Sequence, residues 1–272
     1  MIKISIIVPC FDIKKTIDSC LNSINKQHFS YLRTKLEVIC IVDGNYEDFI
    51  CIKLWRKRNL HNLNFELKII ILKENQGPGF ARYTGFKASS GEFIAFLDDD
   101  DVWNDSKLEV QLDWHLKNPD KIMSGHLYSN GIDYMNTRTK KLKEISLTHL
   151  LIGGVRIATP SIMIRKAIWP YQPEKQRFCE DWLMISMIAS IQNIYIIPKI
   201  LAFRSDKALP IDKDKSSLSN KKLRIRLGKI MGLIILFKRN IINFYSLILL
   251  IIFQVILLLK NIYTLIIKKI RI

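Results

Sequence analysis

Residues 91–103 decide the fold of this chain and read Gly-Glu-Phe-Ile-Ala-Phe-Leu-Asp-Asp-Asp-Asp-Val-Trp. The apolar run from Phe93 to Leu97 has no polar alternation, which predicts a strand that is buried on both faces. Strands of this kind are typical of parallel sheets covered by helices. The four aspartates end the strand and concentrate negative charge in the loop that follows it.

Three similar apolar strands precede this one, and segments with helical spacing or composition lie between them. The strands are expected at 3–8, 37–42 and 67–72, and the helices at 13–24, 49–58 and 80–88. Alternating strands and helices predict an α/β fold with a Rossmann-like, mostly parallel central sheet flanked by helices. A further helix is expected at 180–191, and residues 120–205 are otherwise less regular.

Polar or irregular sequence follows three of the strands at their carboxyl ends. These segments are Pro9-Cys10-Phe11, Asp43-Gly44 and Asp98–Asp101. Open parallel sheets bind ligands beyond the carboxyl ends of their strands, so the three segments together predict a binding site. The glycine-containing loop 75–79 leads into a helix that carries Arg82, an arrangement that suits an anion but equally an ordinary surface loop.

The four successive aspartates suggest a metal site. Adjacent carboxylates repel one another, and their pKa values rise unless a cation neutralises them. Oxygen ligands at a strand end suit Mg²⁺ or Mn²⁺, which complete their coordination with water and substrate phosphates. The alternative is a solvated acidic turn that caps the next helix.

In their order, these motifs resemble those of the inverting family 2 glycosyltransferases, which have the GT-A fold. The resemblance covers roughly residues 3–205. It is based on five segments: Ser5–Phe11 with Ile24–Phe29, Glu37–Asn45, Asn75–Gly85, Gly91–Trp103 and the pair Glu180-Asp181. The Gly91–Trp103 segment is very close to the family's Gly-Glu-Tyr-Ile…Leu-Asp-x-Asp-Asp…Trp pattern.

The resemblance implies roles for individual residues. Nucleotide-sugar binding would involve Pro9, Phe11, Asp43, Arg82, Asp98 and Asp99. The metal ligands would be Asp100, the expected direct ligand, and Asp98, both within the DxD motif. Asp181 would be the general base, with Glu180 beside it, and Trp182 would contact the acceptor. Arg204, in an aromatic-Arg element, would contact diphosphate or an anionic acceptor, although a surface role is equally consistent.

The sequence departs from the family pattern at three positions. Val42 stands where an aspartate is common, Asp12 replaces an asparagine, and Tyr83 replaces the asparagine of Ala-Arg-Asn. None of these changes affects the DxD or Glu-Asp positions, so the chemistry is expected to survive.

The expected chemistry also has a physical basis in these residues. A leaving diphosphate needs its charge neutralised, which a divalent metal does, and the acceptor hydroxyl needs a carboxylate base within hydrogen-bond reach. Asp181 can supply that base from the far side of the cleft, and in-line attack would invert the anomeric configuration. On its own, the Glu180-Asp181 pair is better explained as a favourable helix N-terminus.

Composition narrows the class of protein. The chain has 272 residues, 49% of them hydrophobic and 25% charged, which excludes intrinsic disorder and a polytopic membrane protein. The net charge of +17 first suggests nucleic-acid binding, but residues 221–272 hold 11 of the 42 basic side chains and no acid. Because basic and aromatic residues are not interleaved, we expect no nucleic-acid partner. The five cysteines have no metal-ligand spacing, so we expect a reducing compartment without disulfides.

The C-terminal tail is both basic and apolar. Residues 241–259 contain no charge, and 19 helical residues at ~1.5 Å each nearly match the ~30 Å hydrocarbon core of a membrane. The segment is expected either to span a membrane or to lie in its interface; the alternative is a helix that packs on the catalytic domain or on a partner.

The complete hypothesis divides the chain into three parts. A GT-A catalytic domain is expected at 1–205, with a nucleotide-sugar half at 1–103 and an acceptor half at 104–205. A polar and basic linker at 206–229 and a membrane-associating helical tail at 230–272 follow.

The predicted function is metal-dependent inverting transfer of a sugar from a nucleotide-sugar donor, a UDP-sugar by expectation, to a hydroxyl. The acceptor would be a lipid-linked or cell-surface glycan precursor at the cytoplasmic face of a bacterial inner membrane, where the protein is peripheral or single-pass. Two alternatives remain: a catalytically silent membrane assembly partner, and a nucleotidyltransferase, for which no triphosphate-binding loop is found.

Overall fold

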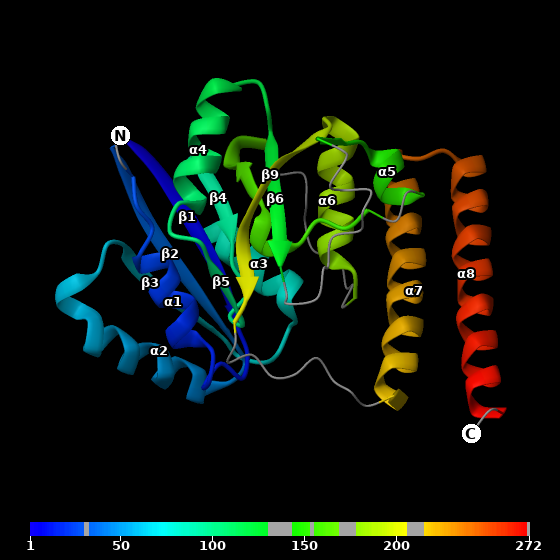
Figure 1. Ribbon diagram of the computed structural model, residues 1–272, viewed down its shortest axis with the longest axis horizontal. Helices are drawn as coiled ribbons and strands as arrows, with labels where there is room; N and C mark the ends of the chain where they lie inside the picture. Colours follow the sequence, from blue (N-terminus) through cyan, green and yellow to red (C-terminus); the bar gives the residue numbers. More distant parts are fainter. Residues whose placement is uncertain (30–32, 130–142, 153–154, 169–177, 206–214, 271–272) are drawn as a thin grey trace.

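The computed structural model describes residues 1–29, 33–129, 143–152, 155–168, 178–205 and 215–270 (Figure 1). Within these residues, nine strands form one sheet: β1 (Ile2–Cys10), β2 (Thr34–Asp43), β3 (Glu66–Leu72), β4 (Phe93–Phe96), β5 (Asp101–Trp103), β6 (Met123–Ser129), β7 (Glu144–Ile145), β8 (Met163–Arg165) and β9 (Ile194–Arg204). The α-helices of the same residues are α1 (Ile17–Asn25), α2 (Tyr46–Asn59), α3 (Pro78–Ala88), α4 (Lys107–Lys117), α5 (Leu147–Leu151), α6 (Glu180–Ile191), α7 (Lys215–Lys238) and α8 (Phe244–Ile270). Short 3₁₀ helices occupy Leu60–Asn62, Thr159–Ser161 and Lys166–Ile168.

The sheet has a parallel half and a mixed half. Its strand order is β3-β2-β1-β4-β8-β6-β9-β5, and β7 pairs with β9. Strands β3, β2, β1 and β4 are parallel, whereas β8 is antiparallel to both of its neighbours, and β5 and β7 are antiparallel to β9. The predicted α/β fold is confirmed, and its parallel part is the half in which strands and helices alternate along the chain.

Successive residues of the parallel strands point to opposite faces, and each face carries its own core. Ile4, Ile6 and Val8 of β1 pack with α1, α2 and α4, whereas Ile7 packs with α3 and α6. All of these side chains are fully buried. Because both faces are covered, the strands are apolar throughout, which is the pattern that the sequence shows.

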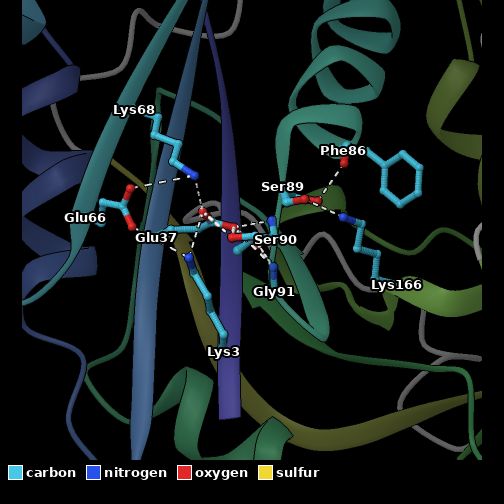
Figure 2. Close-up of polar contacts among 10 residues, drawn as sticks. Lys3, Glu37, Glu66, Lys68, Phe86, Ser89, Ser90, Gly91 and Lys166 are labelled. Carbon is cyan, nitrogen blue, oxygen red and sulfur yellow. Dashed lines mark hydrogen bonds and ion pairs between the residues drawn. The ribbon is translucent and has the colours of Figure 1, made fainter. Parts of the chain in front are cut away.

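A buried carboxylate ties the parallel half together (Figure 2). Glu37 lies within β2, accepts hydrogen bonds from the hydroxyls of Ser5 and Ser90, and pairs with Lys68 Nζ at 2.8 Å and Lys3 Nζ at 3.3 Å. Burial alone would raise the pKa of Glu37, but its hydrogen bonds to Lys68 and the two serines outweigh burial and lower it. The carboxylate therefore joins β1, β2, β3 and the loop before β4.

The two C-terminal helices lie side by side, with α7 packed against α6 and α8 on the far side of α7 (Figure 1). Leu233 and Leu236 of α7 and Leu247 and Leu250 of α8 are at most 8% exposed and belong to the same core as α6. Of the predicted linker, residues 206–214 lie outside the described residues and 215–229 form the first part of α7.

This packing corrects the predicted localisation. Placement at the cytoplasmic face of the inner membrane by a single-pass segment at 241–259 is wrong. In the part of the chain that the structure describes, no helix combines the length and the apolar character needed to cross a membrane. Some apolar side chains of this segment, Leu247 and Leu250 among them, pack in the core shared with α7.

Candidate active site

The carboxyl ends of β1, β2 and β4 surround a cavity of about 340 Å³, which we call the strand-end cavity. Its lining includes all seven residues predicted for nucleotide and metal binding: Pro9, Phe11, Asp43, Arg82, Asp98, Asp99 and Asp100. The parallel half of the sheet brings them together because the carboxyl ends of parallel strands meet at one edge.

Asp43 fixes the loop at the rim of this cavity. Its two carboxylate oxygens accept hydrogen bonds from the backbone N–H groups of Gln76 and Gly77, each at 2.8 Å. Gly77 has a φ of +87°, a conformation that favours glycine, and Pro78 follows in the first turn of α3. The loop that carries Gly77 is thereby held against the end of β2.

The turn after β1 is held by a second carboxylate. Asp48 accepts hydrogen bonds from the backbone N–H groups of Asp12, at 2.8 Å, and of Ile13, at 3.1 Å. Asp12 has a φ of +59°, which asparagine and aspartate tolerate better than most residues, so the replacement of asparagine at this position keeps the turn. Phe11 stands next to it, 55% exposed, at the edge of the strand-end cavity.

Each of the four aspartates has a different polar partner. Asp98 Oδ1 pairs with Arg82 Nη2 at 2.7 Å, and Asp100 Oδ2 pairs with Arg204 Nη2 at 3.1 Å. The remaining two accept hydrogen bonds, Asp99 from the backbone N–H of Phe11 at 3.2 Å and Asp101 from the hydroxyl of Tyr128 at 2.7 Å.

Burial and mutual repulsion alter the acidity of this cluster. Burial raises the pKa of Asp99 to about 7, and the charges of Asp100 and Asp98 add to the rise. Burial and the charge of Asp98 raise the pKa of Asp101 to about 8. The pKa of Asp100 also rises through burial and Asp98, against the opposing charge of Arg204. A region of this kind gains stability from an added cation.

The acidic cluster offers a partial set of metal ligands. Within the described residues, no group of three or more His, Cys, Asp or Glu side chains is arranged to hold a metal ion. Asp98 and Asp100 both line the strand-end cavity, and Mg²⁺ in phosphate-binding enzymes commonly uses one or two carboxylates together with water and substrate phosphates. The residues present therefore fit a divalent ion that is held jointly with a bound diphosphate.

A second cavity of about 320 Å³, the α6 cavity, lies at the start of α6. Glu180, Asp181 and Trp182, the three residues predicted for base catalysis and acceptor binding, all line it. Cys179 precedes them with a φ of +59°, a conformation that costs energy in a residue other than glycine and is frequent next to functional sites. Burial raises the pKa of the Cys179 thiol to about 11, so the thiol stays protonated at neutral pH.

Arg82 joins the two cavities. Its guanidinium contacts Asp98 on one side, at 2.7 Å, and Glu180 Oε1 on the other, at 3.2 Å. Arg82 is 7% exposed, and although burial disfavours its charge, Asp98 and Glu180 outweigh burial and raise its pKa. The guanidinium of Arg82 thus links two carboxylates, and Arg82 and Glu180 lie 98 positions apart in the sequence.

Sequence reasoning missed two cations of the α6 cavity. Arg156 and Lys229 both line it, and neither belongs to a recognisable motif. Lys229 falls in the predicted linker, and the polar composition of that segment does not indicate that this position faces α6. Arg204, by contrast, was noted for its aromatic-Arg pattern, and the structure pairs it with Asp100 at the strand-end cavity.

Comparison with known proteins identifies the family of the chain. The family model described as glycosyl transferase family 2 matches residues 5–180, which include the strand-end cavity and the first residue of α6. The chain belongs to glycosyl transferase family 2. Its fold is the mixed α/β GT-A fold, with additional C-terminal helices.

Two sequence relatives of this family 2 chain carry functional names. An Escherichia coli protein, the UDP-Glc:alpha-D-GlcNAc-diphosphoundecaprenol beta-1,3-glucosyltransferase WfgD, is 34% identical over 123 residues, covering 45% of each chain. The Staphylococcus aureus poly(ribitol-phosphate) beta-N-acetylglucosaminyltransferase TarS is 29% identical over 218 residues, covering 76% of this chain and 35% of TarS. The chain therefore spans less than half the length of either relative.

Solved structures share the fold. TarS residues 1–349 in complex with UDP-GlcNAc superpose with a TM-score of 0.62 at 22% identity, covering 85% of this chain and 66% of the TarS chain. The mannosyltransferase PcManGT of Pyrobaculum calidifontis, in complex with GDP-Man and Mn²⁺, gives a TM-score of 0.65 at 13% identity, covering 86% and 64% of the two chains.

Proposed function

We propose that this family 2 chain transfers a sugar from a nucleotide-sugar donor to an acceptor hydroxyl with inversion at the anomeric carbon. The strand-end cavity binds the nucleotide diphosphate, and the α6 cavity receives the acceptor. The acceptor class is a lipid-linked or cell-surface glycan precursor. Within the chain, residues 1–103 form the donor half and 104–205 the acceptor half of the catalytic unit.

The chain of ion pairs through Arg82 is the observation that carries this proposal. Arg82 lines the strand-end cavity, and its partner Glu180 lines the α6 cavity. Two binding spaces that meet at one buried, permanently charged side chain suit a reaction that joins two substrates. The positive charge of Arg82 also lies where a leaving diphosphate would develop negative charge.

A UDP-sugar is the proposed donor. Phe11, which is exposed at the rim, and Asp43, which is anchored to the loop at 75–78, are positioned to contact the nucleoside. Two relatives support the choice of nucleotide: the name of WfgD includes UDP-Glc, and TarS was solved with UDP-GlcNAc.

Asp98 and Asp100 would hold Mn²⁺ or Mg²⁺ together with the donor diphosphate. When bound there, the ion would neutralise the charge of the leaving diphosphate. The Mn²⁺ complex of PcManGT supports this assignment, as does the excess of carboxylates in the strand-end cavity.

Asp181 is the proposed general base. As the acceptor oxygen attacks the anomeric carbon, its proton passes to the carboxylate of Asp181, and the bond from that carbon to the diphosphate oxygen breaks. Asp181 Oδ1 accepts a hydrogen bond from the backbone N–H of Trp182 at 2.7 Å, which fixes the carboxylate at the start of α6. Glu180 pairs with Arg82 and so positions that side chain rather than taking the proton.

The catalytically silent alternative has little support from the fold. Its one sequence feature is Val42, which occupies a position where the family often has aspartate. Val42 is fully buried in the core between the sheet and the helices, and it is not among the residues that line the strand-end cavity. The proposal does not depend on this position: Asp98 and Asp100 line the strand-end cavity, and Asp181 lines the α6 cavity.

A nucleotide-release assay tests the proposal. The full chain is incubated with Mn²⁺ or Mg²⁺, a panel of UDP-, GDP- and dTDP-sugars, and a bacterial lipid extract as the acceptor source. We expect release of one nucleotide, with a loss of at least about 100-fold in Asp181→Asn. Asp120→Asn, a change at an exposed carboxylate, is the matched control and should keep full activity. Release that is unchanged in Asp181→Asn would contradict the proposal.

A further inference from the structure

The α6 cavity has apolar walls and a cationic region in the same space. Leu150, Val155, Ile157 and Ile225 supply much of the apolar surface, and Arg156 and Lys229 supply the positive charge. Its two acidic residues have other roles in the site: Glu180 pairs with Arg82, and Asp181 is the proposed base. A sugar hydroxyl by itself requires neither a pair of cations nor an extended apolar wall.

Helix α7 is seated closely enough against the start of α6 to bring Lys229 to this cavity. A Cβ atom at Gly228 would lie 2.6 Å from the carbonyl oxygen of Phe178, so the helix reaches this position only with glycine there. Cys179 Sγ donates a hydrogen bond to the carbonyl oxygen of Ile225 at 3.4 Å, one turn earlier on α7. Lys229, which follows Gly228, places its Nζ 5.2 Å from the ring centre of Trp182.

Lys229 lies near two further cations, Arg156, which lines the same cavity, and Arg226. Burial lowers the pKa of Lys229, Cys179 opposes this effect, the charges of Arg156 and Arg226 lower the pKa further, and Asp181 opposes them. Burial and Arg156 likewise lower the pKa of Arg226, which hydrogen-bonds Gln254 of α8 at 2.8 Å. Lysine and arginine side chains bind phosphate through charge-assisted hydrogen bonds, and Arg156 and Lys229 both line this cavity.

We propose that the α6 cavity recognises a phosphate group of the acceptor that is joined to an apolar chain, with Lys229 and Arg156 as its anion-binding residues. The apolar walls contact the chain next to the phosphate, and Asp181 faces the hydroxyl that is to be glycosylated. This inference depends on the proposed function, because it defines the acceptor class of the same site. It makes α7 part of the substrate-binding surface.

Calorimetric titration of the full chain with three probes tests the inference. The probes are n-octyl phosphate, n-octyl β-D-glucoside and inorganic phosphate. We expect n-octyl phosphate to bind at least about tenfold more tightly than either of the others, because it alone engages both the cations and the apolar wall. Equal affinity for the octyl glucoside would overturn anion recognition, and equal affinity for inorganic phosphate would overturn the role of the apolar wall.

Substitutions of Lys229 and Arg156 test whether these two residues bind the phosphate. Lys229→Gln and, independently, Arg156→Gln should each weaken n-octyl phosphate binding about tenfold, whereas Lys229→Arg should retain it. Lys238→Gln, at an exposed lysine on the same helix, is the matched control and should change nothing. Unchanged affinity in both glutamine variants would overturn the inference.

Parallel titration with UDP and Mn²⁺ separates this inference from the proposed function. Wild type and all four variants should bind UDP equally, which also verifies that each variant is folded. Failure of every protein to bind UDP would overturn the proposed function. Normal UDP binding with n-octyl phosphate binding that does not depend on Lys229 or Arg156 would overturn only the phosphate site.

Discussion

The strand-end cavity and the α6 cavity are built in different ways. The first is formed by the ends of parallel strands and their loops, so its residues follow predictable positions in the sequence. The second is formed by α6, the loop around Arg156 and helix α7, which meet only through tertiary packing. Under the proposed function, donor binding would depend on the sheet edge, and acceptor recognition would depend on how the helices pack. We therefore expect substitutions at the strand-end cavity to weaken donor binding and substitutions at the α6 cavity to weaken acceptor binding.

The strongest test of the connection between the two regions is Arg82→Met. Removing the guanidinium leaves Asp98 and Glu180 partly buried without their common partner. We expect the free energy of unfolding to fall by about 3–5 kcal/mol, and nucleotide release to be lost. Chemical denaturation measures the first effect and the release assay the second.

Arg58→Met provides the control for this comparison. Arg58 pairs with Asp18 at 3.0 Å, but the two side chains are 60% and 38% exposed. Breaking this surface pair should cost less than about 1 kcal/mol. A similar loss in both variants would mean that the buried chain through Arg82 contributes no more than a surface ion pair.

The second test concerns the rigidity of the parallel half. Glu37→Gln removes a buried charge that contacts Lys68, Lys3 and two serines, and we expect a loss of about 2–3 kcal/mol at pH 7. Because the pKa of Glu37 is lower in the folded protein than its usual value of 4.5, its contribution is complete above about pH 4.5 and is lost as the pH falls further.

Chemical denaturation of wild type and Glu37→Gln at pH 7 and at pH 3 checks the direction of this pH dependence. The difference in the free energy of unfolding should be smaller at pH 3. Glu66→Gln is the matched control, because Glu66 contacts the same two lysines but its side chain is 58% exposed. A difference that grows as the pH falls would contradict the account.

The third test perturbs the α6 cavity alone. Gly228→Ala introduces a methyl group 2.6 Å from the carbonyl oxygen of Phe178, so α7 must shift. We expect a loss of about 1–3 kcal/mol in unfolding free energy and weaker acceptor binding, with the affinity for UDP unchanged. Leu227→Ala, at an exposed neighbour on the same helix, is the control for acceptor binding. Reduced UDP affinity in Gly228→Ala would mean that the two regions are not separable.

The smallest effect is expected for Arg204→Gln. Arg204 and Asp100 have side chains that are 27% and 34% exposed, so solvent screens their interaction. The free energy of unfolding should change by less than about 1 kcal/mol. UDP affinity should fall severalfold, because we expect Arg204 to contact the diphosphate when the donor binds. An affinity for UDP equal to that of wild type would assign Arg204 a purely structural role.

The same contrast explains what the sequence could predict. Strand ends, the acidic run and the glycine loop are local patterns, and so the sheet edge with Asp43 and Asp98 could be found by inspection. The helix beginning at Glu180 was also predicted with its bounds. Lys229 could not be placed, because a polar, basic stretch looks the same whether it is solvated or docked on α6. The single-pass prediction for 241–259 was wrong for a related reason: apolar side chains that pack against a neighbouring helix have the same composition as those that face lipid.

UDP affinity in two single variants tests the central claim most directly. The claim is that the strand-end cavity binds the donor and the α6 cavity supplies the base. Calorimetry with UDP and Mn²⁺ should give an affinity at least about tenfold weaker in Asp100→Asn and within about twofold of wild type in Asp181→Asn. Equal losses in the two variants, or a loss only in Asp181→Asn, would contradict this division of the site.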